Sequence, residues 1–235
     1  MKILALDSSA KAASVAIIED GFIVGEFFIN TKLTHSQTLV PMVDDLLKRT
    51  ECNIKDIDAF AVSTGPGSFT GIRIGISAIK GMAMALEKPC IGVSSLEALA
   101  YNLIDMDTII CACMDARCDQ VYNAFFSVNQ NSIERLTDDR AIPIIDLKED
   151  LNKYSKKKVN IIGDGAVLCY NKLNEDFSNI NLVSESHRYQ KASGVALAAE
   201  QKFQNGDFVS ASQLLPEYLR LPQAQRELRK RLKLN

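Results

Sequence analysis

A glycine-rich segment with several hydroxyl side chains is the stretch of this sequence best suited to chemistry. It reads Ser63-Thr64-Gly65-Pro66-Gly67-Ser68-Phe69-Thr70-Gly71-Ile72-Arg73-Ile74-Gly75. A glycine-rich turn that opens a helix can bind an anion through free backbone N–H groups and the helix dipole. The spacing matches neither G-x-x-x-x-G-K-[ST] nor G-x-G-x-x-G, because no lysine follows and the third glycine falls one position late. The alternative is steric, with the glycines letting the helix pack close to a sheet.

A carboxylate, Asp7, ends the first apolar strand and could act with this turn. In an ATP-dependent phosphotransferase, Asp7 would hold a metal-bound water and the turn would hold phosphate. The predicted nucleotide or anion site therefore consists of Asp7, Gly65, Gly67, Ser68 and Thr70. ADP or ATP binding is expected only at an interface shared with another subunit, and no intrinsic cofactor is expected.

Other catalytic and metal-binding patterns are missing from the sequence. The two histidines, His35 and His187, are far apart and lack H-E-x-x-H spacing, and no G-x-S-x-G motif occurs. The six cysteines include no C-x-x-C pair. Cys111 and Cys113 share one face of a predicted strand, so a redox or metal role is an alternative, although two thiolates alone make a poor zinc site. No metal site and no protease activity are predicted.

The composition is that of an ordinary soluble globular protein. The chain has 235 residues, 47% of them hydrophobic and 24% charged, with a net charge of −2. Without a leader-like start or an apolar run of membrane-spanning length, reduced cysteines indicate a cytoplasmic protein. Residues 220–235 hold six basic side chains against one acid, a local balance of +5. The predicted tRNA contacts in this basic tail are Arg226, Arg229, Lys230 and Arg231.

Hydrophobic periodicity predicts the same order of elements twice. In the first half the strands are Ile3–Asp7, Ser14–Ile18, Phe22–Ile29 and Ile57–Val62, and the helices are Ser36–Arg49 and Ile72–Leu86. In the second half the strands are Thr108–Met114, Gln120–Val128, Ser132–Ile142 and Val159–Ile162, and the helices are Ile144–Leu151 and Ala166–Leu173. A further helix is predicted over Ser193–Gln204.

This pattern predicts an α/β protein with a duplicated βββαβα unit, as in the actin, hexokinase and heat-shock-protein ATPases (the ASKHA fold). The predicted subdomains are 1–105 and 106–220, followed by the tail 221–235, with helix 193–204 packing back towards the first subdomain. Asp7 occupies the position of the phosphate-hairpin carboxylate, but no glycine lies beside it. Gly163-Asp164-Gly165-Ala166 is either a remnant of an adenosine loop or a plain strand-to-helix turn.

The two helices of the first half are more apolar than one sheet requires. Only Arg73 and Lys80 are charged between residues 72 and 86. A helix that is apolar nearly all round is normally buried on more than one side, either by a partner or by another part of the same chain. The predicted partner-binding residues are Leu39, Val43, Leu46, Gly71, Ile74, Gly75, Ala78 and Met82. Accordingly, Gly75→Arg is predicted to abolish pairing while leaving the chain folded.

Several segments together resemble the TsaB (YeaZ) family, bacterial subunits of the tRNA threonylcarbamoyladenosine (t6A) machinery. They are the glycine-rich stretch, Ile3–Asp7, His35-Ser36, Ser94-Ser95-Leu96-Glu97-Ala98, Met114-Asp115-Ala116-Arg117 and Pro216-Glu217-Tyr218-Leu219-Arg220. The resemblance covers the chain apart from the basic tail. It implies a non-catalytic relative of the catalytic subunit TsaD, whose H-x-x-x-H metal motif is replaced here by Ser95 and Leu99.

The resemblance also implies a function in a complex. The chain would bind TsaD through helices 36–49 and 72–86, form a homodimer through them when TsaD is absent, and support the ATPase TsaE. The complex would transfer a threonylcarbamoyl group to N6 of adenosine 37 in tRNAs that read ANN codons. No membrane partner is expected. The alternative is an active ATP-dependent phosphotransferase of the same fold.

Overall fold

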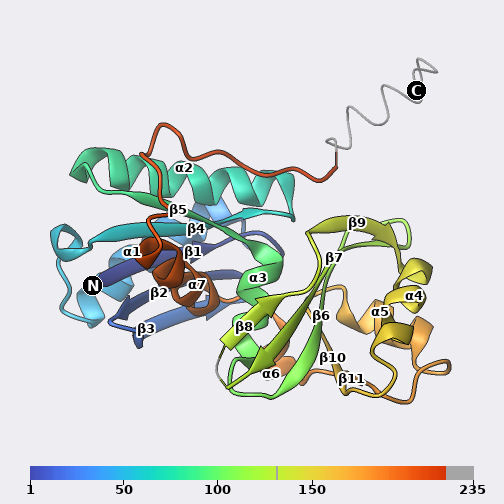
Figure 1. Cartoon of the computed structure of the whole chain (residues 1–235). Coiled ribbons are helices and arrows are strands. Elements are labelled where there is room, and N and C mark those ends of the chain that lie inside the picture. Colours follow the sequence, from blue (N-terminus) through green and yellow to red (C-terminus); the bar gives the residue numbers. More distant parts are fainter. Residues whose placement is uncertain (131, 221–235) are drawn as a thin grey trace, which may run out of the picture.

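The computed structural model describes residues 1–130 and 132–220, which form two α/β lobes (Figure 1). The first lobe has a five-stranded sheet in the order β3-β2-β1-β4-β5. Strands β1, β2 and β3 are antiparallel neighbours, and β4 and β5 run parallel to β1. These strands are β1 (Lys2–Asp7), β2 (Ala13–Glu19), β3 (Phe22–Ile29), β4 (Ala59–Gly65) and β5 (Cys90–Ser94).

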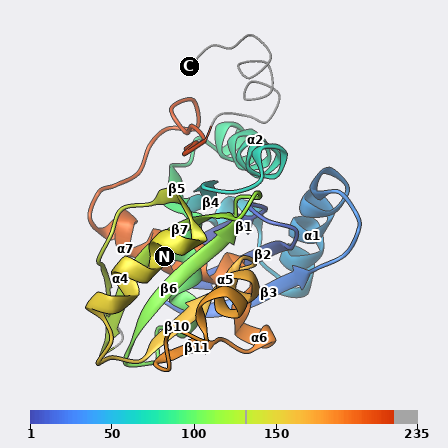
Figure 2. The same cartoon turned by 90° about the vertical axis from the view of Figure 1, so that its right-hand side faces the viewer.

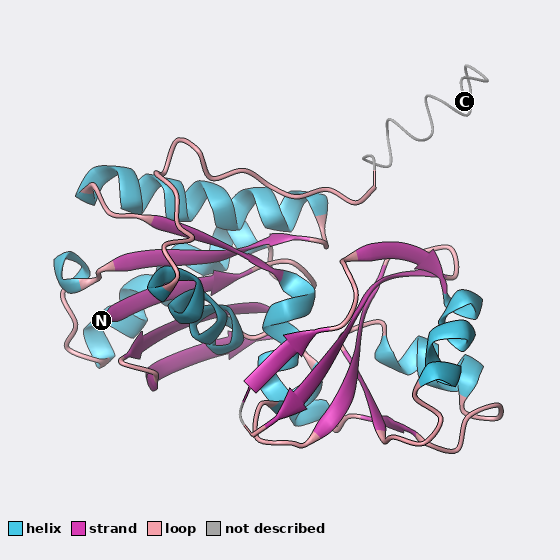
Figure 3. Cartoon of the chain, viewed as in Figure 1, coloured by secondary structure: helices cyan, strands magenta, loops and turns pink. Residues whose placement is uncertain are grey.

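Alternating side chains give the first sheet two apolar faces, as strand geometry requires. Leu4 and Leu6 point to the face covered by α1 (His35–Arg49) and α2 (Phe69–Leu86). Ile3 and Ala5 point to the opposite face, where α7 (Ala192–Gln204) packs. Figure 3 shows helices on both sides of this sheet. The short helices of this lobe are η1 (Ile54–Asp56), α3 (Ser95–Ala100) and η2 (Tyr101–Leu103).

The second lobe repeats the arrangement with a six-stranded sheet. Its order is β11-β10-β6-β7-β8. The sixth strand, β9, pairs with residues 120–123 of β7, whereas β8 pairs with residues 126–129 of the same strand. The strands are β6 (Thr108–Asp115), β7 (Gln120–Asn129), β8 (Ser132–Arg135), β9 (Arg140–Pro143), β10 (Val159–Ile162) and β11 (Ile180–Leu182). The helices are η3 (Ile144–Asp146), α4 (Leu147–Lys153), α5 (Ala166–Leu173) and α6 (Glu185–Arg188). One face packs on α4 and α5, and the other packs on α3.

The predicted duplicated fold is confirmed, with local differences. The predicted third strand of the second unit, 132–142, is two strands, β8 and β9, which both pair with β7. The sequence patterns did not predict β5, α3, β11 or α6. The predicted helix over 72–86 begins earlier, at Phe69, because the Ser68 side chain caps it by accepting a hydrogen bond from the backbone N–H of Gly71 at 3.2 Å.

The C-terminal part of the described chain returns to the first lobe. Helix α7 contributes Ala192, Val195 and Ala196 to the core on β1 and β2. The segment 205–220, here called the C-terminal strap, pairs with β5 through Cys90 and Val209 and then runs beside α2 (Figure 1). Helix α7 therefore packs on the first lobe, as predicted for helix 193–204. Most of the strap also packs there, although the predicted second subdomain, 106–220, includes it.

The expectation that the chain has no apolar run of membrane-spanning length is wrong, because α2 is such a run. Its 18 residues have a mean hydropathy of 1.3, so it is long and apolar enough to cross a membrane. The predicted helix, 72–86, is shorter than a membrane span, whereas α2 begins at Phe69 and reaches 18 residues. In the folded chain the helix packs on the first sheet through Ile72, Ile76 and Ile79, which belong to the lobe's core.

Two glycines of α2 pack against the β1–β2 turn rather than offering a surface to a partner. A Cβ added at Gly71 would lie 2.1 Å from the carbonyl oxygen of Ser8. A Cβ added at Gly75 would lie 2.4 Å from Ser8 Oγ and 3.2 Å from Val62. Both glycines are buried. The predicted partner contacts at Gly71 and Gly75 are therefore wrong, and an arginine at position 75 would disrupt the fold as well as any pairing.

We predict that Gly71→Ala lowers the free energy of unfolding by about 2 kcal/mol or more, because the new methyl group would overlap a buried backbone carbonyl. Gly81→Ala is the matched control, since nothing lies within 4 Å of its added Cβ and the position is exposed on the same helix. That change should stabilise the chain by about 0.5–1 kcal/mol through helix propensity. Urea unfolding of both variants measures this, and equal effects would contradict the close packing.

Candidate functional site

Asp7 is fully buried at the end of β1 and is held by hydroxyl groups. Its Oδ1 accepts hydrogen bonds from the Ser9 backbone N–H at 2.9 Å and the Ser9 Oγ at 2.8 Å. Its Oδ2 accepts one from Ser63 Oγ. Burial raises the pKa of Asp7 above its ordinary value, and these hydrogen bonds only partly oppose the shift. The hydrogen-bond partners of the carboxylate, Ser9 and Ser63, both belong to the first lobe, which favours a structural role for Asp7.

The glycine-rich turn lies against the chain's own backbone. A Cβ at Gly67 would lie 2.2 Å from the carbonyl oxygen of Ser9, and that oxygen accepts a hydrogen bond from the Ser68 N–H at 2.6 Å. A Cβ at Gly65 would lie 2.2 Å from the carbonyl oxygen of Glu217 in the strap. The space beside both glycines thus holds protein carbonyls, which repel a phosphate. This geometry favours the steric interpretation of the turn.

The predicted nucleotide residues are brought together only in part. Asp7, Gly67 and Ser68 meet around the β1–β2 turn, since Ser9 contacts each of them. Gly65 faces the strap instead. Thr70 is exposed and lines a separate groove between α1 and α2.

The corresponding turn in the second lobe is equally closed. A Cβ at Gly163 would lie 2.1 Å from the carbonyl oxygen of Cys113, which also accepts a hydrogen bond from the Gly165 N–H at 3.1 Å. Asp164 is bound by Gln190 Nε2 at 3.0 Å, and burial raises the pKa of this carboxyl. The arrangement is that of a tightly packed strand-to-helix turn.

The two positions where the resemblance places the histidines of TsaD are occupied by a serine, whose buried Oγ has no hydrogen-bond partner within the described residues, and by a leucine. Ser95 and Leu99 lie one helical turn apart on α3 and are fully buried. Leu99 packs with Ile110, Ala112 and Ile162 of the second lobe. Across residues 1–130 and 132–220, no three His, Cys, Asp or Glu side chains are grouped so that they could hold a metal ion.

The cysteines of the second lobe form a buried cluster. The sulfur atoms of Cys111 and Cys113 lie 3.5 Å apart, and Asn123 Nδ2 donates to Cys111 Sγ at 3.4 Å. The hydrogen bond from Cys111, together with burial, raises the pKa of Cys113. A hydrogen bond with Cys113 and burial likewise raise the pKa of Cys169. Protonated thiols are poor nucleophiles and metal ligands, so this cluster favours a packing role.

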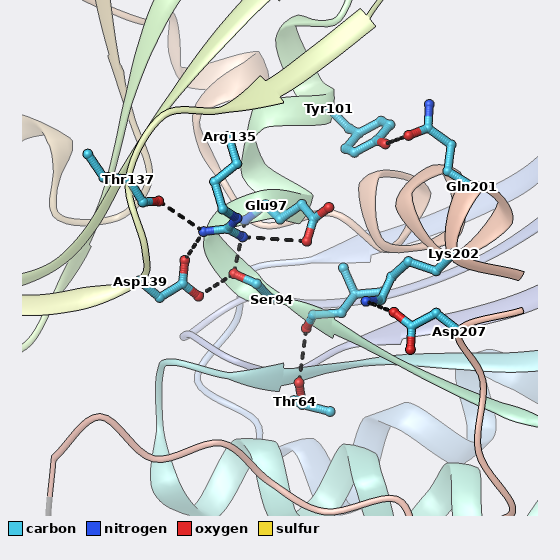
Figure 4. Close-up of polar contacts among 11 residues, drawn as sticks. Thr64, Ser94, Glu97, Tyr101, Arg135, Thr137, Asp139, Gln201, Lys202 and Asp207 are labelled. Atoms are coloured by element: carbon cyan, nitrogen blue, oxygen red, sulfur yellow. Dashed lines mark hydrogen bonds and ion pairs between the residues drawn. The ribbon is translucent and has the colours of Figure 1, made fainter. Parts of the chain in front are cut away.

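Ion pairs and hydrogen bonds connect the second lobe to α3 and to the end of β5 (Figure 4). Arg135 of β8 pairs with Glu97 of α3 at 3.5 Å and also with Asp139. Asp139 accepts a hydrogen bond from Ser94 Oγ at the end of β5. The guanidinium of Arg135 lies 4.8 Å from the centroid of the Phe126 ring. These contacts hold the β8–β9 connection against the first lobe.

A groove of about 620 Å³ lies between α1 and α2 on the first lobe. The two helices pack against each other and lie side by side in Figure 2. Ile74 and Ala78, two of the predicted partner-binding residues, line the groove, and Val40 lies on it with 57% of its surface exposed. The complete lining is His35, Ser36, Leu39, Val40, Phe69, Thr70, Arg73, Ile74, Ser77 and Ala78.

The remaining predicted partner-binding residues are buried or half-buried. Leu39 lines the groove but is only 1% exposed, and Val43 and Leu46 are 3% and 1% exposed. Met82 is half-buried against the first-lobe core. For Val43 and Leu46 the prediction is wrong, because an amphipathic face that covers a sheet looks the same in sequence as one that binds a partner. Arg226, Arg229, Lys230 and Arg231 lie outside the described residues.

Sequence reasoning missed the end of the groove nearest the strap. Arg73 Nε donates a hydrogen bond to the Tyr218 hydroxyl at 2.7 Å, and its guanidinium lies 3.9 Å from the centroid of the Phe69 ring. The Phe69 and Tyr218 rings stack with centroids 4.7 Å apart. The signals in the sequence were Arg73, one of two charged residues on the apolar helix, and the two quoted segments that contain Phe69 and Tyr218.

Two sheets with repeated topology, joined through α3 and α7, define an actin-like ATPase fold whose two glycine turns contact the chain's own carbonyls. The family model described as "TsaD: tRNA N6-adenosine threonylcarbamoyltransferase" matches residues 24–228. The chain belongs to this family, and within it to the TsaB (YeaZ) group.

Individual relatives agree with this assignment. The chain is 29% identical over 226 residues to "tRNA threonylcarbamoyladenosine biosynthesis protein TsaB" of Bacillus subtilis, covering 96% of each chain. It is 40% identical over 135 residues to the Escherichia coli protein of the same name, covering 57% of this chain and 58% of the other. The solved structure of YeaZ from Pseudomonas aeruginosa aligns with a TM-score of 0.77 and 28% identity, covering 93% of this chain and 99% of that one.

We predict that Asp7→Asn stabilises the chain relative to wild type more at pH 7 than at pH 4. A raised pKa means that folding disfavours the ionised carboxylate. That penalty is absent below the ordinary value of 3.8 and complete above the pKa in the folded chain, so wild type loses stability as the pH rises between them. Asparagine resembles the protonated acid and avoids the loss.

Urea unfolding at the two pH values gives the comparison. Asp45→Asn, at an exposed position of α1, is the control and should follow the wild-type pH dependence. A difference between Asp7→Asn and wild type that stays constant with pH would contradict the prediction.

Proposed function

We propose that this chain is a non-catalytic scaffold and activator in t6A biosynthesis. It acts by binding the catalytic subunit TsaD, so that the complex transfers a threonylcarbamoyl group to N6 of adenosine 37 in tRNAs that read ANN codons. The names of its relatives support the process, and membership of the TsaD family supports pairing between related subunits. The observation that carries the proposal is the α1/α2 groove, which is lined by the apolar side chains of Val40, Ile74 and Ala78.

The groove has the character expected of a protein interface. Val40, Ile74 and Ala78 provide an apolar centre, and Arg73 and Phe69 provide the residue types common in binding hot spots. A stable pair buries about 1,200–2,000 Å² in total, which requires both helices rather than one. Because the same surface would serve a second copy and TsaD, homodimer and heterodimer compete for it.

We infer the lack of catalysis from the side chains and backbone groups that occupy the positions of a metal and a phosphate site. Ser95 and Leu99 cannot replace two imidazoles as metal ligands; both are fully buried, and Leu99 packs against the second lobe. The turns that would hold phosphate contact backbone carbonyls instead. We therefore assign metal binding and group transfer to TsaD and ATP hydrolysis to TsaE, with any nucleotide contact of this chain confined to a shared interface.

The proposal predicts that Val40→Arg weakens binding to TsaD at least tenfold, because the charge would be buried against an apolar surface. Ile145→Arg is the matched control, since Ile145 is 59% exposed, against 57% for Val40, and lies in the second lobe. Isothermal titration calorimetry with purified TsaD measures both variants. Circular dichroism should show that both remain folded.

Two outcomes would refute the scaffold function. One is unchanged TsaD affinity of Val40→Arg with normal tRNA modification by the reconstituted system. The other is modification of tRNA, or turnover of ATP with a phosphate acceptor, by this chain alone, which would support the phosphotransferase.

A further inference from the structure

A turn between α4 and β10 carries three consecutive lysines without ionic partners. Lys156, Lys157 and Lys158 are all exposed, and none forms an ion pair within the described part of the chain. Three other lysines of the same lobe are neutralised. Lys148 pairs with Asp176 at 2.6 Å, Lys153 with Asp150 at 2.8 Å and Lys172 with Asp119 at 2.7 Å. The excess positive charge is therefore concentrated at one place.

The backbone beneath these lysines is held firmly. Asn179 Nδ2 donates to the carbonyl oxygens of Tyr154 at 3.0 Å and Lys157 at 2.8 Å. The carbonyl oxygen of Lys158 accepts hydrogen bonds from the Ile109 N–H and the Thr108 Oγ1, both at 3.2 Å. The three side chains thus project from a fixed base, which lowers the entropy lost when they bind a charged surface.

The charge of the whole chain makes this cluster unusual. The net charge is −2, so the rest of the chain without these three lysines carries −5. Adjacent like charges repel one another, and the nearby acids neutralise other lysines. Such a cluster on an acidic protein is suited to contact with a polyanion.

The surroundings favour a nucleic acid over an acidic protein. No large apolar side chain is exposed between residues 146 and 166, all of which the structure describes. A protein interface normally has an apolar centre, whereas lysines alone are sufficient for contact with a phosphate backbone. The lysines also follow α4, on the opposite side of the molecule from α1 (Figures 1 and 2), so they remain accessible when the groove is occupied.

We propose that Lys156, Lys157 and Lys158 form a second-lobe contact for the phosphate backbone of RNA. With the proposed function, which this inference assumes, the RNA is the tRNA substrate of the complex. The contact is independent of sequence, because ammonium groups read phosphate charge and not base edges. The lysine contact sets the orientation of the tRNA on this chain, the proposed non-catalytic subunit.

The test is tRNA binding by the TsaD complex of a variant with Lys156, Lys157 and Lys158 all changed to Gln. Each phosphate contact contributes about 0.7–0.9 to the slope of log affinity against log salt, so the loss of three contacts should lower the slope by about 2.1–2.7. Between 50 and 200 mM KCl the variant should accordingly lose about 20- to 40-fold less affinity than wild type. Filter binding with unmodified tRNA over that range measures both slopes.

The matched control changes Lys32, Lys55 and Lys88 to Gln, which removes the same charge from the first lobe, where these side chains form no ion pair within the described residues. The inference is overturned if both triple variants lose the same slope, or if neither differs from wild type.

Calorimetry with TsaD on the same preparations separates this inference from the proposed function. Normal TsaD affinity with an unchanged salt slope refutes the lysine contact alone. Weaker TsaD affinity in the lysine variant, with unchanged tRNA binding, assigns the cluster to an acidic protein and also overturns the inference. If wild type itself fails to bind TsaD, the proposed function fails, and tRNA titration of the isolated chain still compares the two triple variants.

Discussion

The close approach of α2 to the β1–β2 turn is the constraint on which the rest of the first lobe depends. The Ser8 carbonyl lies where a side chain at Gly71 would begin, and the Ser9 carbonyl lies where one at Gly67 would begin. Both oxygens come from the turn that follows Asp7. This packing fixes the helix on the sheet and thereby sets its distance from α1. The groove between the two helices is a consequence of how tightly α2 is seated.

At the joint between the lobes, apolar packing takes the place of the polar groups that catalysis would need. In α3, Leu96, Leu99 and Ala100 belong to a core shared with the second sheet. Arg135 adds charged contacts at the edge of the same joint. Ligand-binding proteins of two lobes commonly open and close by hinge motion around a cleft. An apolar joint of this kind favours a fixed relation between the lobes, which suits a subunit that presents surfaces to others.

The sequence predicted the fold well because local pattern and tertiary position agree over most of the chain. Strand β3 and helix α5 fall on the predicted residues, since period and turn signals coincide there. The division of 132–142 into two strands could not be predicted, because both pair with β7 and only tertiary structure sets that register. For the candidate site, Leu39, Ile74 and Ala78 lie on the groove, and their contact with a partner stays a prediction. Val43 and Leu46 were predicted wrongly, because periodicity finds an apolar face without showing what covers it.

The return of α7 to the first sheet has a consequence for synthesis of the chain. Ala192, Val195, Ala196 and Ala199 complete a core whose other half is built from β1, β2 and β4 near the N-terminus. One face of the first sheet therefore stays uncovered until nearly the whole polypeptide has left the ribosome, while the second lobe is already complete in sequence. Vectorial folding, in which the domain made first also finishes first, is reversed here.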